Sequence, residues 1–150
     1  MQIDIRKAEN SDRDPIARFQ VAMALETEQY NLDLFTVQNG VSAVLTNDTL
    51  GAYYVAIVEN EVVGSLLTTY EWSDWRNGTV LWIQSVYVDS SYRQRGIYAA
   101  LYSYVKRLVA SNDSLVGIRL YVDESNKKAM EVYARLGMNG EHYRVFEWMK

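Results

Sequence analysis

The chain has 150 residues, of which 49% are hydrophobic and one is proline, a composition that suits one folded domain with a sizeable core. A formal net charge of −4 argues against a general nucleic-acid-binding protein. The absence of cysteine excludes disulfides and thiolate metal sites, and a single histidine excludes multi-histidine metal sites. We therefore expect a single domain over residues 1–150, with no metal and no nucleic-acid partner.

The first half of the chain predicts a strand, two helices and three strands. Ile3 and Ile5 alternate with polar residues like a strand rather than a signal peptide, and no uncharged apolar run is long enough to span a membrane. A cytoplasmic protein without membrane contact is the resulting expectation. Helices are expected over residues 15–28 and 33–45, the second with a candidate break at Asn39-Gly40. Strands are expected over residues 53–58, 62–70 and 80–88, with tight turns at residues 59–61 and at Asn77-Gly78.

The second half alternates helices and strands. A helix should begin near Ile97, because apolar residues follow it at helical spacing. A strand is expected where Ile118, Leu120 and Val122 alternate, followed by a helix capped by Ser125 or Asn126. Gly137 should end that helix in a Schellman cap, and residues 142–149, which include His142, should form the last strand.

The segment from Val86 to Leu101 is the strongest candidate for a binding site. An apolar strand runs through a polar turn and a basic, glycine-containing loop into a helix. The start of a helix presents free backbone N–H groups and the positive end of the helix dipole, which together favour a phosphate group. Arg93 and Arg95 add positive charge, and Gly96 permits close approach to the backbone. The alternative is an ordinary strand–helix connection with solvated arginines.

Two motifs give this chain a resemblance to a known family. The sequence Arg93-Gln94-Arg95-Gly96-Ile97-Tyr98 resembles the acyl-CoA-binding motif Arg/Gln-x-x-Gly-x-Gly/Ala of the GNAT superfamily of N-acetyltransferases, and departs from it at Tyr98. Downstream, an Asn126, Ala129, Tyr133 and Leu136-Gly137-Met138 pattern is similar to the second motif of that family. The resemblance implies an α+β fold, with a mixed, mostly antiparallel central sheet flanked by about four helices. It also implies acetyl-CoA as cosubstrate and direct attack of a primary amine on the thioester.

The resemblance also implies roles for particular residues. Backbone N–H groups near the end of the fourth strand would bind the thioester and the pantetheine arm, the loop would bind the pyrophosphate, and Asn126 would contact the pantetheine region. The implied cofactor-binding residues are Val86, Tyr87, Val88, Arg93, Gln94, Arg95, Gly96, Ile97, Tyr98, Ala99 and Asn126. Tyr133 would protonate the departing thiolate, since a phenol is protonated at neutral pH; its alternative role is a packed tyrosine on a helix.

The sequence does not clearly identify the residue that acts as the base and deprotonates the amine. The expected fourth strand carries no carboxylate, so Glu71 at the end of the preceding strand is the first candidate and Glu26 and Glu28 are weaker ones. A water chain to bulk solvent is an equal alternative. The missing carboxylate also keeps a second reading open, in which the chain is a non-catalytic acyl-CoA-binding or protein-interaction module.

The segment Glu71-Trp72-Ser73-Asp74-Trp75-Arg76-Asn77-Gly78 is unusual, and is similar to a segment in a subset of family members. It favours packing under the sheet edge or a homodimer contact, because tryptophan is enriched in interfaces. Its alternative use is an acceptor site in which aromatic rings and carboxylates hold a cation. Carboxylates in the elements expected to form the acceptor cleft predict a small amine without net negative charge. They are Glu26, Glu28, Asp33, Glu71 and Asp74.

Overall fold

The computed structural model describes residues 1–150 and divides into two compact units, residues 1–119 and residues 120–150. The first unit carries the whole β-sheet and three of the four α-helices. The second carries the fourth helix and the C-terminal segment.

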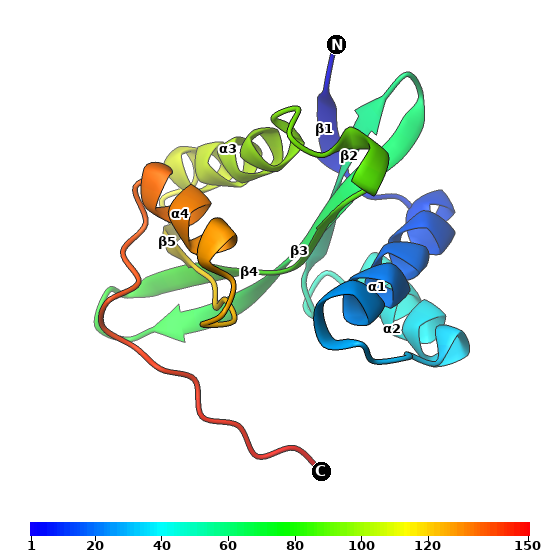
Figure 1. The fold of residues 1–150 in the computed structure, drawn as a ribbon. Helices are drawn as coiled ribbons and strands as arrows, with labels where there is room; N and C mark the ends of the chain where they lie inside the picture. Colours follow the sequence, from blue (N-terminus) through cyan, green and yellow to red (C-terminus); the bar gives the residue numbers. More distant parts are fainter. The chain divides into compact units, whose positions relative to one another are not determined.

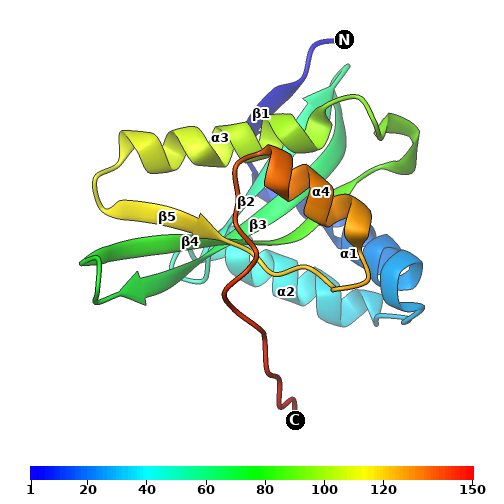
Figure 2. The same ribbon diagram turned by 60° about the vertical axis from the view of Figure 1, so that its left-hand side comes forward.

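The sheet of the first unit has five strands in the order β1-β2-β3-β4-β5 (Figures 1 and 2). The strands are β1 (Asp4–Lys7), β2 (Ala52–Val58), β3 (Glu61–Ser73), β4 (Gly78–Val88) and β5 (Leu115–Arg119). The first four pair antiparallel with their neighbours, whereas β5 runs parallel to β4. The prediction of an α+β fold with a mixed, mostly antiparallel sheet is therefore confirmed.

Helices cover both faces of this sheet (Figure 2). The paired helices α1 (Arg13–Glu28) and α2 (Leu34–Thr46) pack on one face, where Ile16, Ala17 and Val41 meet Tyr53 and Val55 of β2. Helix α3 (Ile97–Ser111) packs on the other face and buries Ile97, Leu101, Tyr102 and Val105 at helical spacing. No break occurs at Asn39-Gly40, so α2 is continuous there.

A buried carboxylate fixes the start of α1. A short 3-10 helix, η1 (Asn10–Asp12), precedes α1, and Asp12 is 4% exposed. Its carboxylate accepts hydrogen bonds from Arg6 at 2.7 and 3.1 Å and from the Glu9 backbone N–H at 2.7 Å. Burial alone would raise the pKa of Asp12, but these three donors outweigh it and the pKa is lowered. This contact ties β1 to the first turn of α1.

Local sequence signals explain the two hairpins. The turn between β2 and β3 places Glu59 and Asn60 at φ of 50° and 66°, as a two-residue turn with both central residues left-handed requires. Asn77 adopts φ of 49° immediately before Gly78, the first residue of β4. β3 continues to Ser73, beyond the predicted end at Tyr70, so Trp72 lies on the strand while Trp75 lies in the turn at residues 74–77.

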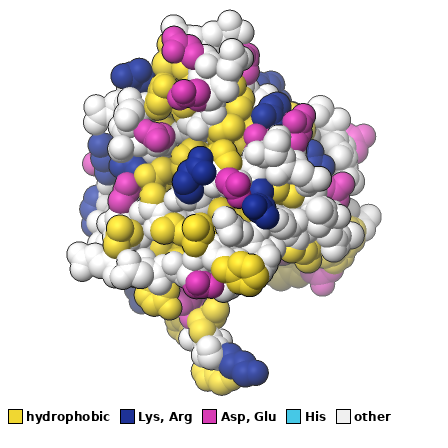
Figure 3. Space-filling model, turned by 90° about the vertical axis from the view of Figure 1, so that its right-hand side faces the viewer, with side chains coloured by type: hydrophobic (Ala, Val, Ile, Leu, Met, Phe, Trp, Pro, Cys, Tyr) yellow, Lys and Arg dark blue, Asp and Glu magenta, His cyan; other side chains and the backbone are white.

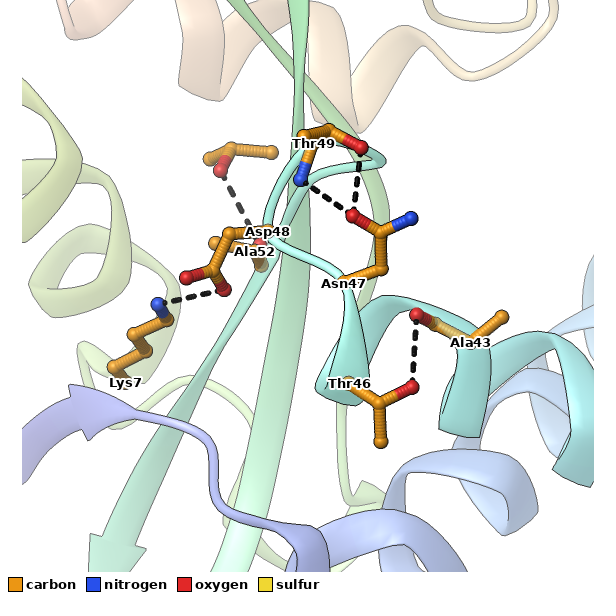
Figure 4. A network of polar contacts seen from close by, with 8 residues as sticks. Lys7, Ala43, Thr46, Asn47, Asp48, Thr49 and Ala52 are labelled. Carbon is orange, nitrogen blue, oxygen red and sulfur yellow. Dashed lines mark hydrogen bonds and ion pairs between the residues drawn. The ribbon is translucent and has the colours of Figure 1, made fainter.

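The loop between α2 and β2 is ordered by a set of polar contacts (Figure 4). The Asn47 side-chain oxygen accepts from the backbone N–H and the hydroxyl of Thr49 at 3.1 and 2.6 Å, and Lys7 pairs with Asp48 at 3.0 Å. A Cβ at Gly51 would lie 2.4 Å from the Thr68 carbonyl oxygen, so only glycine fits there. These contacts fix the entry of the chain into β2.

The second unit contains α4 (Lys127–Arg135), with Asn126 as its N-cap. At its end, the N–H of Met138 donates to the Tyr133 carbonyl at 3.1 Å and that of Gly137 to the Ala134 carbonyl at 3.0 Å. These two bonds, with Gly137 at φ of 88°, are the predicted Schellman cap.

Two strand predictions are wrong in part or in whole. The strand expected at residues 118–122 ends at Arg119 and begins earlier, at Leu115. Residues 142–149 form no strand, although they alternate in polarity. Such alternation determines which face each side chain takes, but a strand also needs hydrogen bonds to a neighbouring strand. This segment has no such partner, and Phe146 and Trp148 are 94% and 89% exposed.

Candidate active site

The end of β4 lies beyond its pairing with β5. Pairing between the two strands runs from Thr79 to Trp82, whereas β4 continues to Val88. Tyr87 and Val88 pair with β3 on the other side, so the edge of β4 toward β5 has no strand partner there. Unpaired strand N–H and C=O groups are costly when buried unless a ligand or water satisfies them. This stretch contains the predicted residues Val86, Tyr87 and Val88.

A β-bulge accompanies this separation. The pairing register between β3 and β4 shifts between Ser65 and Leu67, opposite residues 85 and 86 of β4. Ser85 adopts φ of 54°, an uncommon value for a residue other than glycine and a strained one within a strand. A bulge re-aims the strand, and bulges are frequent beside functional sites.

The predicted phosphate loop connects β4 to α3. A short 3-10 helix, η2 (Ser90–Tyr92), follows β4, and the Asp89 carboxylate accepts from the Ser91 N–H at 2.8 Å. Gln94 and Gly96 adopt left-handed φ of 62° and 82°. No side chain caps the start of α3, and a Cβ at Gly96 would have no heavy atom within 4 Å. The loop therefore presents an open surface at the N-terminus of a 15-residue helix.

The two arginines of the loop have different surroundings. Arg93 donates to the Val88 carbonyl at 2.9 Å and forms an ion pair with Glu26 of α1 at 2.8 Å. Arg95 lies over the Tyr92 ring, 5.5 Å from its centroid, and forms no ion pair.

Glu26 joins α1 to the end of β4 as well as to the loop. Its second oxygen accepts from the Tyr87 hydroxyl at 2.9 Å. The hydrogen bond from Arg93, followed by that from Tyr87, lowers the pKa of Glu26. Burial, and then the hydrogen bond to Glu26, raises the pKa of Tyr87. Glu26, a weaker base candidate from the sequence, thus contacts two predicted cofactor-binding residues.

Glu71, the first base candidate, lies on β3 among side chains of two other strands. It accepts a hydrogen bond from the indole N–H of Trp82 on β4 at 3.0 Å and forms an ion pair with Arg119 of β5. Next to this cluster, Gln84 donates to the Thr69 hydroxyl at 3.0 Å. Arg119 is absent from the sequence-based site. Its parallel register opposite Trp82 brings it to Glu71.

These ion pairs change the charge expected for the acceptor region. Glu26 and Glu71 are each compensated by an arginine, and Asp33 caps α2 through the Thr36 N–H at 3.0 Å. Figure 3 shows acidic and basic side chains interspersed over one face of the molecule, with hydrophobic side chains between them. The local negative charge is therefore smaller than the carboxylates alone imply.

The tryptophans of the β3–β4 hairpin are exposed. Trp72 is 64% and Trp75 is 89% exposed, so the prediction that they pack under the sheet edge is wrong. An interface contact and an acceptor contact remain as predictions for these two rings.

The remaining predicted residues, Asn126 and Tyr133, lie on α4 in the second unit. The Asn126 side-chain oxygen accepts from the Ala129 N–H at 3.1 Å, which makes Asn126, not Ser125, the N-cap. Its side-chain NH₂ makes no hydrogen bond. Tyr133 is half-buried on the helix, and its carbonyl takes part in the Schellman cap.

No group of three or more His, Cys, Asp or Glu side chains is placed to hold a metal ion. None of the helices has the length and apolar character needed to cross a membrane. A hollow of about 300 Å³ lies between the start of α1 and the end of α2, and none of the predicted site residues lines it.

Comparisons with known proteins agree with this geometry. Residues 14–138 match the model of the acetyltransferase (GNAT) family. A possible acetyltransferase from Clostridium difficile 630 is 43% identical with a TM-score of 0.92, over 100% of this chain and 99% of that one. A comparison with curated proteins found no match.

Two more distant structures share the fold. An aminoglycoside acetyltransferase from an uncultured soil metagenomic sample, in complex with sisomicin, is 16% identical with a TM-score of 0.76, over 99% of this chain and 95% of that one. AAC(6′)-Iy, in complex with the bisubstrate analogue CoA-S-monomethyl-acetylneamine, is 16% identical with a TM-score of 0.77, over 100% of this chain and 99% of that one.

Proposed function

Because the chain belongs to the acetyltransferase (GNAT) family, we propose that it transfers an acetyl group from acetyl-CoA to a primary amine of a small acceptor. The observation that carries the proposal is the junction of β4 and α3. There, a strand end without a β5 partner leads into an open, glycine-containing loop at the start of a long helix.

In this proposal, acetyl-CoA binds along that junction. The pyrophosphate binds the backbone N–H groups of residues 93–99, where the helix dipole favours negative charge. The pantetheine arm and the thioester carbonyl bind the backbone of Val86, Tyr87 and Val88, in the manner of a peptide added to a strand edge. The unpaired edge of β4 and the absence of a capping side chain on α3 support this placement.

The transfer step needs two proton movements. The amine nitrogen attacks the thioester carbonyl carbon, and the C–S bond breaks as the tetrahedral intermediate collapses. The thiolate takes a proton from the Tyr133 hydroxyl, while the proton lost by the amine passes to Glu71 or to water. Asn126 contacts the pantetheine region through its side-chain NH₂, since its oxygen is occupied by the helix cap.

The acceptor is proposed to be a small amine without net negative charge, such as a polyamine, an aminoglycoside or a basic amino-acid derivative. Uncompensated carboxylates at Glu28 and Asp74 support a cationic acceptor. Two proteins of the same fold hold an aminoglycoside or an aminoglycoside-based analogue, although their identity to this chain is low.

The engagement of Glu71 by Trp82 and Arg119 favours one alternative, a module that binds acyl-CoA without turnover. A thiol-release assay with acetyl-CoA separates the two. It would use a panel of amino acids, polyamines, aminoglycosides and peptide N-termini at low and high salt. We expect saturable, salt-sensitive release of CoA with a cationic amine. CoA binding by calorimetry with no release on the whole panel would instead support the binding module.

A further inference from the structure

The loop residue Arg93 makes three contacts within the protein. Its Nε donates to the Val88 carbonyl at 2.9 Å, and its Nη2 donates to Glu26 Oε2 at 2.8 Å. Its guanidinium carbon lies 5.2 Å from the centroid of the Tyr87 ring, within the range of a cation–π contact. Because Tyr87 also donates to Glu26, the three side chains form a closed cluster that joins α1, the end of β4 and the loop.

This cluster removes most of the positive charge that Arg93 would offer to a phosphate. A guanidinium paired with a carboxylate at 2.8 Å is close to neutral as a pair, and its fixed fork of donors is partly occupied. To interact with an unpaired Arg93 guanidinium, a phosphate would have to displace Glu26. Otherwise the phosphate would meet the Arg93–Glu26 pair, whose net charge is near zero.

Arg95 differs from Arg93 in having no carboxylate partner. Like Arg93 it is exposed and lies over a tyrosine ring, that of Tyr92, but it forms no ion pair, so its charge is uncompensated. It directly precedes Gly96, where the surface is open. Among the loop side chains, Arg95 thus carries the positive charge that is available to an anion.

We propose that Glu26 is a positioning residue, whose ion pair with Arg93 connects α1 to the loop, and that Arg95 supplies the phosphate-binding charge. The proposal rests on the proposed binding of CoA by this loop. It assigns separate roles to two arginines that the sequence motif treats alike. It also connects α1 to the cofactor loop through a named side chain.

The first test measures CoA affinity by calorimetry at several salt concentrations. We expect Arg95→Ala to weaken CoA binding about tenfold or more and to reduce its salt dependence, since one charge-assisted contact is lost. Arg93→Ala should change the affinity by less than about threefold while lowering the melting temperature. Arg93→Lys is the matched variant, because it keeps the charge but cannot bridge Val88 and Glu26 together. It should behave like Arg93→Ala in melting temperature.

The second test measures the contact between Glu26 and Tyr87 within the cluster. The pKa of the Tyr87 phenol is raised partly by the Glu26 carboxylate, so Glu26→Gln should let one tyrosine ionise at lower pH. Ultraviolet absorbance near 295 nm follows that ionisation, and Tyr87→Phe identifies the signal. If Glu26 does not contact Tyr87 in the folded protein, Glu26→Gln will leave this titration unchanged. That result would overturn the proposed positioning role of Glu26.

The outcomes separate this proposal from the proposed function. If Arg93→Ala abolishes CoA binding and Arg95→Ala does not, the assignment of roles is overturned while CoA binding by the loop stands. If the unmodified protein binds no CoA at all, the proposed function and this proposal both fail.

Discussion

Glu71 of β3 and Arg119 of β5 form an ion pair across the intervening strand β4, whose Trp82 donates its indole N–H to the same carboxylate. The two partners are 48 residues apart in the sequence and belong to strands that do not pair with each other. Because three strands meet at this carboxylate, a change at Glu71 affects the sheet as well as any role in catalysis.

Glu71→Gln should lower stability more than turnover. The substitution removes the ion pair, which lies at partly exposed side chains, and should cost about 1 kcal/mol, or about 3 °C in melting temperature. We expect kcat to fall by less than about tenfold. Glu61→Gln is the matched control, because Glu61 lies exposed on the same strand but makes no ion pair. A fall in kcat of about 10² or more with unchanged melting temperature would instead identify Glu71 as the base.

Gly96→Asp should weaken CoA binding strongly. The substitution places a carboxylate beside the proposed pyrophosphate site at the start of α3, where aspartate is otherwise a favourable helix N-cap. Gly96→Ala controls for the left-handed φ of 82°, which costs a residue with a Cβ about 1 kcal/mol. We expect calorimetry to show CoA affinity at least about tenfold lower for the aspartate variant than for the alanine variant. Equal CoA affinities of the aspartate and alanine variants would show that the pyrophosphate does not bind this loop.

The contribution of Glu26 to stability should depend on pH. Its pKa is lowered from 4.5 in the folded chain, so the folded state favours the carboxylate form. The stabilisation is therefore present above the unfolded pKa and is lost as the pH falls through the folded pKa. Glu26→Gln should lower the melting temperature at pH 7, and this difference should shrink progressively as the pH falls below 4.5 and through the lower pKa of the folded chain. A difference that persists unchanged at pH 3 would show that the carboxylate charge is not its source.

Trp75→Ser should leave stability unchanged, because a side chain that is 89% exposed contributes little to the core. We expect the substitution to weaken self-association, measured by sedimentation over a range of protein concentrations, since exposed aromatic residues mark interaction surfaces. A raised KM for the amine with unchanged association would place the ring in the acceptor site instead.

The sequence predicted those features that depend on neighbouring residues. The helix cap at Ser125 or Asn126, the Gly137 Schellman cap and the turn at residues 59–61 each follow from the conformational preference or hydrogen bonding of a few adjacent residues. For the same reason, the loop at Gly96 and the start of α3 at Ile97 were predicted at the correct positions.

Features that depend on register between distant segments were not predicted. The bulge at Ser85 exists only because β3 and β4 pair with a shift, and the sequence of β4 alone does not reveal it. The Glu26–Arg93 pair joins residues 67 positions apart and altered the interpretation of Arg93. The absent C-terminal strand has the same cause, because alternation over residues 142–149 specifies no hydrogen-bond partner.

Tyr133→Phe should lower turnover far more than CoA affinity. Loss of a positioned general acid typically costs about 10²–10⁴ in rate, whereas the phenyl ring keeps the packing of the half-buried side chain on α4. The thiol-release assay gives kcat, and calorimetry with CoA gives the affinity of the same variant. Tyr121→Phe is the matched control, as it removes a hydroxyl from an exposed tyrosine of the same unit and should retain full activity. Wild-type turnover in Tyr133→Phe would exclude this hydroxyl from the reaction and leave protonation of the thiolate to water.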